Sequence, residues 1–284
     1  MIEVLAPGPL ATVQDLGREG YAALGVPRSG AADVRSFRLA NRLVGNHEAA
    51  AGIEATLGGL RLRFHVATTI ALTGAPTPAT VDGYQIGMNG PVRVDAGSRL
   101  CLGLPTEGLR TYLAVRGGVA VPPVLGSRAT DVLSGVGPAV LAAGSTLPIG
   151  KDIAHWPNVD IAPTPPLPVE ATLRVVRGPR DDWFTSAALD TLVSRPYEVT
   201  TNSNRIGNRL TGAVLDRVRR GELPSEGMVR GALQVPPSGQ PVLFLVDHPV
   251  TGGYPVIAVV LESDLPLAAQ LRPGQHVRFR YASV

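Results

Sequence analysis

Glycine and proline interrupt this chain so often that long helices have little room to form. With 33 Gly and 26 Pro among its 284 residues, the chain favours tight turns that join short segments. The segments between the turns are rich in Val, Ile, Leu and Thr, which is typical of buried strands. We therefore expect a mainly β protein with few short helices. The expected strands cover residues 2–5, 60–64, 69–73, 99–104, 111–115, 172–176, 242–246 and 256–260.

Three short helices are expected between the strands. Asp33 is a favourable N-cap for a helix that runs to Val44, where a Gly-Asn pair follows as a stop signal. A second helix is expected to begin near Asp181 or Asp182. Its expected apolar face consists of Trp183, Phe184, Ala187 and Leu192. A short third helix is expected to follow Ser263 as its cap.

The length of the chain and one proline-rich stretch predict two domains. A chain of 284 residues exceeds the usual size of a single domain. Residues 151–170 hold five prolines and show no helix or strand period, which indicates an extended linker. We expect an N-terminal domain of residues 1–165 and a C-terminal domain of residues 166–284. Residues 95–103, 142–150 and 272–279 each place a Gly turn before a strand able to close a barrel, which favours two related β units, although turn chemistry alone explains the similarity equally well.

Charge and cysteine content argue against several classes of protein. The formal net charge is +3, but the 25 Arg and the single Lys151 are scattered along the chain, unlike the clustered basic residues of a nucleic-acid-binding protein. The single cysteine, Cys101, excludes an intramolecular disulfide, and its apolar surroundings favour a packing role. The N-terminus lacks the features of a signal peptide and no run of about 18 apolar residues occurs, so we expect a cytoplasmic protein.

The common catalytic motifs are missing from the sequence. It contains no GxSxG, HExxH, paired CxxC or GxGxxG motif. The segment from Gly144 to Asp152 resembles a phosphate loop, but it has five residues between its glycines where that loop has four, and Asp in place of Ser or Thr. We interpret it as a turn before a strand. The five histidines are far apart, so no metal site is predicted.

Three polar, Gly-rich segments stand out from the apolar sequence, at residues 12–33, 201–212 and 225–255. Glycines allow a ligand to approach the backbone, and Asn, Arg, Gln and Asp supply directed donors and acceptors, so we expect the segments to line one pocket. An Arg flanked by Asn residues, as Arg205 is, suits a carboxylate, a phosphate or a cyclic amide carbonyl. The alternative is that each segment only forms turns, with Asp247 accepting hydrogen bonds from backbone amides.

Six motifs make the chain recognisable. They are TVQDLGREGY, GVPRSGAAD, ANRLVGN, SNRIGNRL, EGMVRGALQVPPSGQPV and TGGYPVIAVV, in this order along nearly the whole chain. In these motifs the chain resembles the allophanate hydrolase subunit 2 family, also called the biotin-dependent carboxyltransferase family, which includes the C subunit of 5-oxoprolinase. The resemblance implies two β-barrel-like domains, with cyclophilin-like topology in at least one, and an obligate partner of the subunit 1 type. The chain departs from the family's usual DRQTTGGYPK, because it reads DHPVTGGYPV at 247–256.

The resemblance and the three segments together give a set of candidate site residues. We expect the loop at 247–255 to lie at a barrel edge, where Asp247 orients Arg205, Tyr254 supplies a hydroxyl and two glycines expose backbone amides. The candidate catalytic residues are Asp247, Arg205 and Tyr254. The candidate substrate-binding residues are Asn204, Gln234, Thr251, Gly252, Gly253, Gln14 and Asp15. No metal ligand is expected.

The resemblance implies part of an enzyme complex, with three interpretations of its function. The first is a subunit of an ATP-dependent 5-oxoprolinase, an amidohydrolase that opens the lactam of 5-oxoproline to glutamate and is inactive as a single chain. ATP then binds at the level of a complex with a partner similar to the B subunit of 5-oxoprolinase, with or without a third oxoprolinase protein. The second is a biotin-dependent carboxyltransferase component acting on urea or a related amide, with biotin carried by another chain. The third is a regulatory protein that sequesters its subunit 1 partner.

Overall fold

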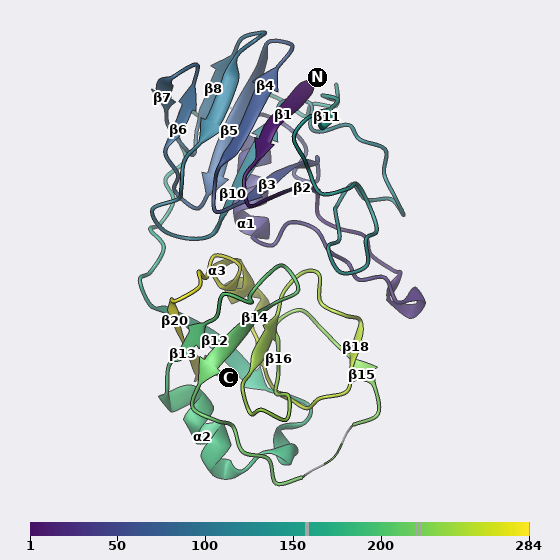
Figure 1. Cartoon of the computed structure of the whole chain (residues 1–284), viewed down its shortest axis with the longest axis vertical. Helices are drawn as coiled ribbons and strands as arrows, with labels where there is room; N and C mark the ends of the chain where they lie inside the picture. Colours follow the sequence, from purple (N-terminus) through teal and green to yellow (C-terminus); the bar gives the residue numbers. More distant parts are fainter. Residues whose placement is uncertain (157–158, 220, 222, 284) are drawn as a thin grey trace. The chain divides into compact units, whose positions relative to one another are not determined.

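A computed structural model describes residues 1–156, 159–219, 221 and 223–283 (Figure 1). It divides into two compact units. The first unit consists of Met1–Arg18, Ser29–Asp131 and Gly135–Leu167, and the second of Glu19–Arg28, Val132–Ser134 and Pro168–Val284. Strands dominate both units, and the described residues include three short α-helices, so the expectation of a mainly β protein with few short helices is confirmed. The longest of these helices has 10 residues, and none in the described part of the chain qualifies as a membrane span.

The first unit contains two antiparallel sheets. The strand order is β11-β1-β4-β9-β6-β7 in the six-stranded sheet and β2-β3-β10-β5-β8 in the five-stranded sheet. The strands are β1 (Ile2–Pro7), β2 (Leu10–Gln14), β3 (Gly52–Thr56), β4 (Leu60–Phe64), β5 (Thr68–Gly74), β6 (Ala79–Val81), β7 (Tyr84–Ile86), β8 (Pro91–Val94), β9 (Arg99–Leu102), β10 (Arg110–Val115) and β11 (Thr146–Leu147).

The five-stranded sheet is buried on both faces, as its central strand β10 shows. Successive side chains of a strand point to opposite faces. Leu113 and Val115 join the large apolar core of the first unit. Tyr112 and Ala114 join a second cluster, formed with the helix α1 (Val34–Leu43). All six residues of β10 are therefore buried, which explains why its sequence is mostly apolar after Arg110.

Helix α1 begins where the sequence predicted. The Asp33 carboxylate accepts a hydrogen bond from the amide of Ser36 at 2.9 Å, so Asp33 is the N-cap. The helix ends at Leu43, and Gly45 follows with a φ of +70°. A side chain at residue 45 would collide with the carbonyl oxygen of His155. The stop therefore requires glycine for both its backbone angle and its space.

The second unit is built around a closed barrel with the strand order β12-β19-β16-β17-β14-β13-β20. The barrel strands are β12 (Ala171–Arg177), β13 (Tyr197–Val199), β14 (Gly207–Gly212), β16 (Ala232–Gln234), β17 (Val242–Phe244), β19 (Val256–Val260) and β20 (His276–Tyr281). A separate two-stranded sheet joins β15 (Glu226–Gly227) to β18 (Thr251–Gly252). The shorter helical elements are η1 (Ala22–Leu24), η2 (Asp181–Trp183), α2 (Ser186–Ser194), η3 (Glu262–Asp264) and α3 (Leu265–Ala268).

Two helices of the second unit begin later than predicted. Residues 181–183 form only a single 3-10 turn, and α2 starts after Thr185, whose side chain accepts a hydrogen bond from the amide of Ala188. A Thr cap satisfies a free amide of the first turn, so it sets the start of the helix in place of the two aspartates upstream. The buried face of α2 consists of Ala188, Leu189 and Leu192, while Ala187 is exposed. The predicted cap Ser263 is also wrong, because η3 precedes α3 and Asp264 is its N-cap.

Three glycine turns precede strands in the manner expected from the sequence. Gly97, Gly144 and Gly274 have φ values of +90°, +85° and +83°. Each lies two residues before a strand, at β9, β11 and β20. Positive φ favours glycine. The segment that resembles a phosphate loop is thus a turn followed by the two-residue strand β11.

The proline-rich stretch 151–170 is extended and hydrogen-bonded to the first unit as far as Leu167. The amide of Ala154 donates to the carbonyl of Gly45 at 2.9 Å, and the amide of Ala162 donates to the carbonyl of Asn89 at 2.7 Å. The centre of the Trp156 ring lies 3.6 Å from the guanidinium carbon of Arg116. Residues 157 and 158 of the predicted linker lie outside the described residues. The predicted domain boundary between residues 165 and 166 stays a prediction.

Candidate functional site

The backbone of the second unit brings Arg205 and Asp247 together, although they are 42 positions apart. β14 and β17 pair as antiparallel strands, and the chains before and after them continue side by side. The amide of Leu245 donates to the carbonyl of Ile206 at 2.9 Å, and the amide of Asp247 donates to the carbonyl of Arg205 at 3.1 Å. The end of this strand pair therefore fixes where both side chains begin.

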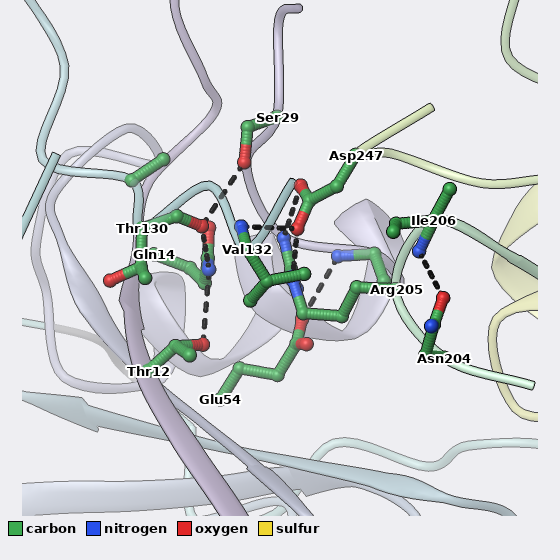
Figure 2. Close-up of polar contacts among 12 residues, drawn as sticks. Thr12, Gln14, Ser29, Glu54, Thr130, Val132, Asn204, Arg205, Ile206 and Asp247 are labelled. Atoms are coloured by element: carbon green, nitrogen blue, oxygen red, sulfur yellow. Dashed lines mark hydrogen bonds and ion pairs between the residues drawn. The ribbon is translucent and has the colours of Figure 1, made fainter. Parts of the chain in front are cut away.

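The side chains of Arg205 and Asp247 form a two-point ion pair (Figure 2). The Nε of Arg205 donates to Oδ2 of Asp247 at 2.9 Å, and its Nη2 donates to Oδ1 at 3.1 Å. The amide of Val132 adds a third hydrogen bond to Oδ2 at 3.1 Å. The predicted contact, with Asp247 orienting Arg205, is therefore present. The carboxylate that this edge of the guanidinium binds is the protein's own.

Burial makes this ion pair a determinant of loop geometry. Both side chains have no exposed surface. Two buried charges offset each other's desolvation only while their geometry is maintained, and the loss of either partner is expensive. Arg205 and Asp247 therefore hold the start of the 247–255 loop in one position.

Asn204, next to this pair, makes the contacts of a turn-forming residue. Its side-chain oxygen accepts hydrogen bonds from the amide of Ile206 at 2.8 Å and from the amide of Gly207 at 3.4 Å. Such a bond from an Asn to the backbone two residues ahead replaces a backbone turn. The turn interpretation of the Asn-rich segment thus holds for this oxygen, and the turn aims Arg205 at Asp247.

Gln234, Gly252 and Tyr254 meet in a second group of candidate residues. The Nε2 of Gln234, at the end of β16, donates to the carbonyl of Tyr254 at 3.1 Å and lies 3.8 Å from the sulfur of Met228. A Cβ at residue 252 would lie 2.6 Å from that nitrogen, so only glycine leaves Gln234 in place. Gln234 therefore positions the backbone just before β19 and does so with 6% of its surface exposed.

Tyr254 turns its ring towards solvent from this fixed backbone. The residue is 39% exposed. The guanidinium carbon of Arg217 lies 6.0 Å from the centre of the ring, within the range of a cation–π contact. A hydrogen bond holds Arg217, because its Nη2 donates to the carbonyl of Val235. The hydroxyl of Tyr254 is thus carried by a ring that is oriented yet accessible.

The hairpin of β15 and β18 carries Thr251 and Gly252, and it is held by an ion pair that the sequence analysis did not predict. Gly252 pairs with Glu226 in the ladder, so its backbone is engaged there, whereas the expectation was an exposed amide. The carboxylate of Glu226 accepts hydrogen bonds from Nε of Arg180 at 2.9 and 3.1 Å. The hydrogen bond from Arg180 lowers the pKa of Glu226 below its usual value. Thr251 is exposed, and Gly253 is half-buried.

The remaining two candidates, Gln14 and Asp15, belong to the first unit. Asp15 is a hub for backbone and hydroxyl groups: it accepts hydrogen bonds from the amide of Gly17 at 2.8 Å, the hydroxyl of Ser127 at 2.6 Å and the amide of Arg128 at 2.6 Å. These contacts hold the chain after β2 against residues 127–128. Gln14, the last residue of β2, is fully buried. Asp15 therefore positions its neighbours.

A buried polar network in the first unit was not foreseen from the sequence. The Oε2 of Glu54 accepts hydrogen bonds from the hydroxyl of Tyr112 at 2.8 Å and from the amide of Ala32 at 3.0 Å. Its Oε1 lies 3.5 Å from Nε of Arg110, and both side chains are 1% exposed. Burial, followed by the charge of Glu54, raises the pKa of Tyr112 well above its usual value. The strand pairing Tyr112↔Glu54 creates this network, and residues 58 positions apart leave no local pattern.

The described residues hold no group of three or more His, Cys, Asp or Glu side chains that could bind a metal ion. Cys101 is a free, partly buried residue of β9. The chemistry available from the described candidates is hydrogen bonding, charge stabilisation by Arg, and proton donation by Tyr. It suits the binding of a small polar molecule.

Comparison with known proteins gives a single family. Residues 24–281 match the family described as carboxyltransferase domain, subdomain A and B. The chain is 38% identical to the C subunit of Escherichia coli 5-oxoprolinase over its whole length and over 92% of that protein. It is 37% identical to urea amidolyase of Lachancea kluyveri over 98% of this chain and 17% of that enzyme. The crystal structure of K. lactis urea amidolyase superposes with a TM-score of 0.94 at 34% identity, covering 99% of this chain and 19% of the other.

Proposed function

The chain belongs to the family of the carboxyltransferase domain, subdomain A and B, and on that premise we propose that it is a subunit of an ATP-dependent 5-oxoprolinase. The observation that carries this proposal is the 38% identity to the C subunit of E. coli 5-oxoprolinase, which extends over the whole chain and 92% of that protein. The partner is a subunit 1 type protein similar to the B subunit of 5-oxoprolinase, together with a third oxoprolinase protein. ATP binds at the level of this complex.

The candidate residues suit a lactam substrate in separate ways. ATP activates the lactam oxygen by phosphorylation in such a reaction, and water then opens the ring to glutamate. Within this chain, Asp247 orients Arg205, whose charge stabilises the negative charge that develops on the substrate. Tyr254 supplies a hydroxyl, and Gln234 holds the backbone that carries it. The further proposed substrate contacts are Asn204, Thr251, Gly252, Gly253, Gln14 and Asp15.

A second candidate function has its own support. The chain is 37% identical to a urea amidolyase over 98% of its length, and the TM-score to a urea amidolyase structure is 0.94. These similarities favour a carboxyltransferase component that acts on urea or a related amide, with biotin on another chain. Because the chain covers 17% of that relative, the activity of the larger enzyme requires further domains.

Reconstitution is expected to separate the two functions. We expect the chain alone to show no ATP-dependent hydrolysis of 5-oxoproline, and the chain co-purified with a subunit 1 type partner and a third oxoprolinase protein to release glutamate. Glutamate and ADP are measured together. The control assembly contains a biotin carboxylase and a biotinylated carrier, assayed with urea and bicarbonate. Turnover only in the control assembly rejects the 5-oxoprolinase proposal, and tight partner binding without turnover in either assembly leaves the regulatory interpretation.

The Tyr254 hydroxyl gives a second test of the site. In the active assembly, Tyr254→Phe is expected to lower kcat by about 10- to 100-fold, because one hydrogen bond to a charged transition state is lost while the ring and its contact with Arg217 stay. The matched control is Tyr84→Phe, since Tyr84 is 80% exposed in the first unit. Equal kcat values for the two variants would remove Tyr254 from the catalytic residues.

A further inference from the structure

Three buried side chains of the first unit carry polar atoms that lack a hydrogen-bond partner among the described residues. They are Oε1 of Gln14, Oγ1 of Thr130, and both Nε and Nη1 of Arg18. Gln14 is 0% exposed, Arg18 is 2% exposed and Thr130 is 3% exposed. Folded proteins leave few buried polar atoms unsatisfied, because each costs about 1–3 kcal/mol. Their concentration in two adjoining segments therefore calls for an explanation.

The orientation of the Gln14 amide group follows from its partners (Figure 2). Its nitrogen donates to the carbonyl of Thr130 at 2.9 Å and to the hydroxyl of Thr12 at 3.0 Å. A carbonyl can only accept, so the nitrogen must face Thr130 and the oxygen must point elsewhere. The hydroxyl of Ser29 donates to the same carbonyl at 3.2 Å, which holds this side of the group in place. Gln14 therefore presents a fixed, buried acceptor.

Arg18 presents fixed donors within one residue of the same place. Its Nη2 donates to the carbonyl of Ala129, the residue before Thr130. Gly137 closes over this end of the guanidinium, because a Cβ there would lie 2.9 Å from Nη2. Asp15 fastens the two segments together through Ser127 and Arg128. Arg18 therefore keeps a positive charge in a buried position, with two N–H edges still to be satisfied.

We propose that Gln14, Arg18 and Thr130 bind the cyclic amide or urea group of a small ligand. Such a group places an N–H donor beside a carbonyl acceptor. The N–H of the ligand donates to Oε1 of Gln14, its carbonyl accepts from Arg18, and the hydroxyl of Thr130 completes the set. A carboxylate satisfies Arg18 but offers no donor to Gln14. The combination of a fixed acceptor with fixed donors is what selects an amide.

This site rests on the proposed function for the choice of ligand and extends it to a named chemical group. A lactam such as 5-oxoproline and the acceptor urea both carry an N–H beside a carbonyl, so one recognition chemistry serves both candidate reactions. Arg18 and Thr130 join Gln14 as specificity-determining residues. None of the three is assigned a role in bond making.

Binding of simple amides to the full-length chain tests the site directly. Ligand-observed NMR with 2-pyrrolidone is expected to show saturable binding, and urea is expected to compete with it. Cyclopentanone has the same ring and carbonyl without the N–H, so it is expected to bind at least about tenfold more weakly, the effect of one lost hydrogen bond. Equal binding of 2-pyrrolidone and cyclopentanone, or no binding of 2-pyrrolidone, overturns the proposal.

A pair of Thr→Val variants separates ligand binding from structural stabilisation. Thr130→Val removes a hydroxyl without a protein partner among the described residues, so we expect unchanged thermal stability and about tenfold weaker binding of 2-pyrrolidone. Thr111→Val is the matched control. The Thr111 hydroxyl donates to the carbonyl of Ala75 at 2.9 Å in the same unit, so its loss is expected to lower Tm by about 2–4 °C and to leave binding unchanged.

The outcomes decide between this site and a purely internal role of the three residues. If Thr130→Val binds 2-pyrrolidone as tightly as the wild type, the hydroxyl serves only ordered water or nothing, and the proposal is overturned. Arg18→Lys, which keeps the charge but not the two N–H edges, is expected to weaken binding in the same way. A chain that binds 2-pyrrolidone but supports no 5-oxoproline hydrolysis on reconstitution retains this site and rejects the proposed function.

Discussion

Replacing Asp247 with Asn is expected to lower the free energy of unfolding by about 3–5 kcal/mol, the range for breaking a buried ion pair. The carboxylate and the Arg205 guanidinium are fully buried and share two hydrogen bonds. Asn keeps the size and shape of Asp, so little packing is lost and the change reports on charge and hydrogen bonding. Denaturant unfolding of the purified chain measures it.

Further variants identify the ion pair as the cause. Asp95→Asn is the control, because Asp95 pairs with Arg93 at the surface at 3.8 Å with both side chains 81% exposed, and no measurable change is expected. The double variant Arg205→Met with Asp247→Leu is expected to be more stable than Asp247→Asn, since it removes both charges. Arg205→Lys retains the charge without the two-point geometry and should lie between wild type and Asp247→Asn. A loss below about 1 kcal/mol in Asp247→Asn would contradict this description of the pair.

Glu54→Gln is expected to destabilise the first unit by about 3 kcal/mol. It removes the carboxylate that faces the buried guanidinium of Arg110, and it turns an acceptor-only group into one that must also place two N–H donors. Hydrogen exchange of the β3 and β10 amides, or unfolding by denaturant, measures the loss.

Two controls separate charge from hydrogen bonding in this network. Glu48→Gln makes the same chemical change at a residue that is 42% exposed and pairs with Arg38 and Arg42, and it is expected to have little effect. Tyr112→Phe removes only the hydroxyl that donates to Glu54, with an expected loss of about 1–3 kcal/mol. If Glu54→Gln is no worse than Glu48→Gln, the network does not stabilise the first unit.

Local signals explain why much of the fold was predictable. The Asp33 cap and the three glycine turns depend on a few neighbouring residues, so their sequence pattern is sufficient. Strands such as β4 and β19 are long enough to show an apolar pattern, and both have the predicted bounds. β6, β7, β13 and β16 have three residues each, which is too short for a period, and they were missed.

Errors in the predictions arose where two local signals compete. Asp181, Asp182 and Thr185 are all acceptable caps, and the sequence does not show which of them has a following turn that packs. The structure selects Thr185, because Leu189 and Leu192 then reach the apolar core of the second unit. The same competition moved the start of the third helix from Ser263 to Asp264.

The candidate site was only partly predictable, for a related reason. The contact between Arg205 and Asp247 was expected because both belong to recognisable motifs. The pairs Arg180 with Glu226 and Glu54 with Arg110 were not, because strand register and loop packing bring them together from distant positions. The surroundings of Arg18 and Thr130 depend in the same way on two segments that are far apart in the chain, as the 111 positions between Arg18 and its partner Ala129 show.

The parallel pairing of β12 with β20 has a consequence for how the second unit is made. These strands are the first and last of the barrel, and their register runs from Ala171↔Val277 to Val175↔Tyr281. During synthesis β12 leaves the ribosome early and waits for nearly the whole unit before its neighbour exists. Long-range pairing of this kind folds slowly, and an unpaired strand edge attracts other chains. The nascent chain is therefore most vulnerable to aggregation in the interval between the synthesis of these two strands.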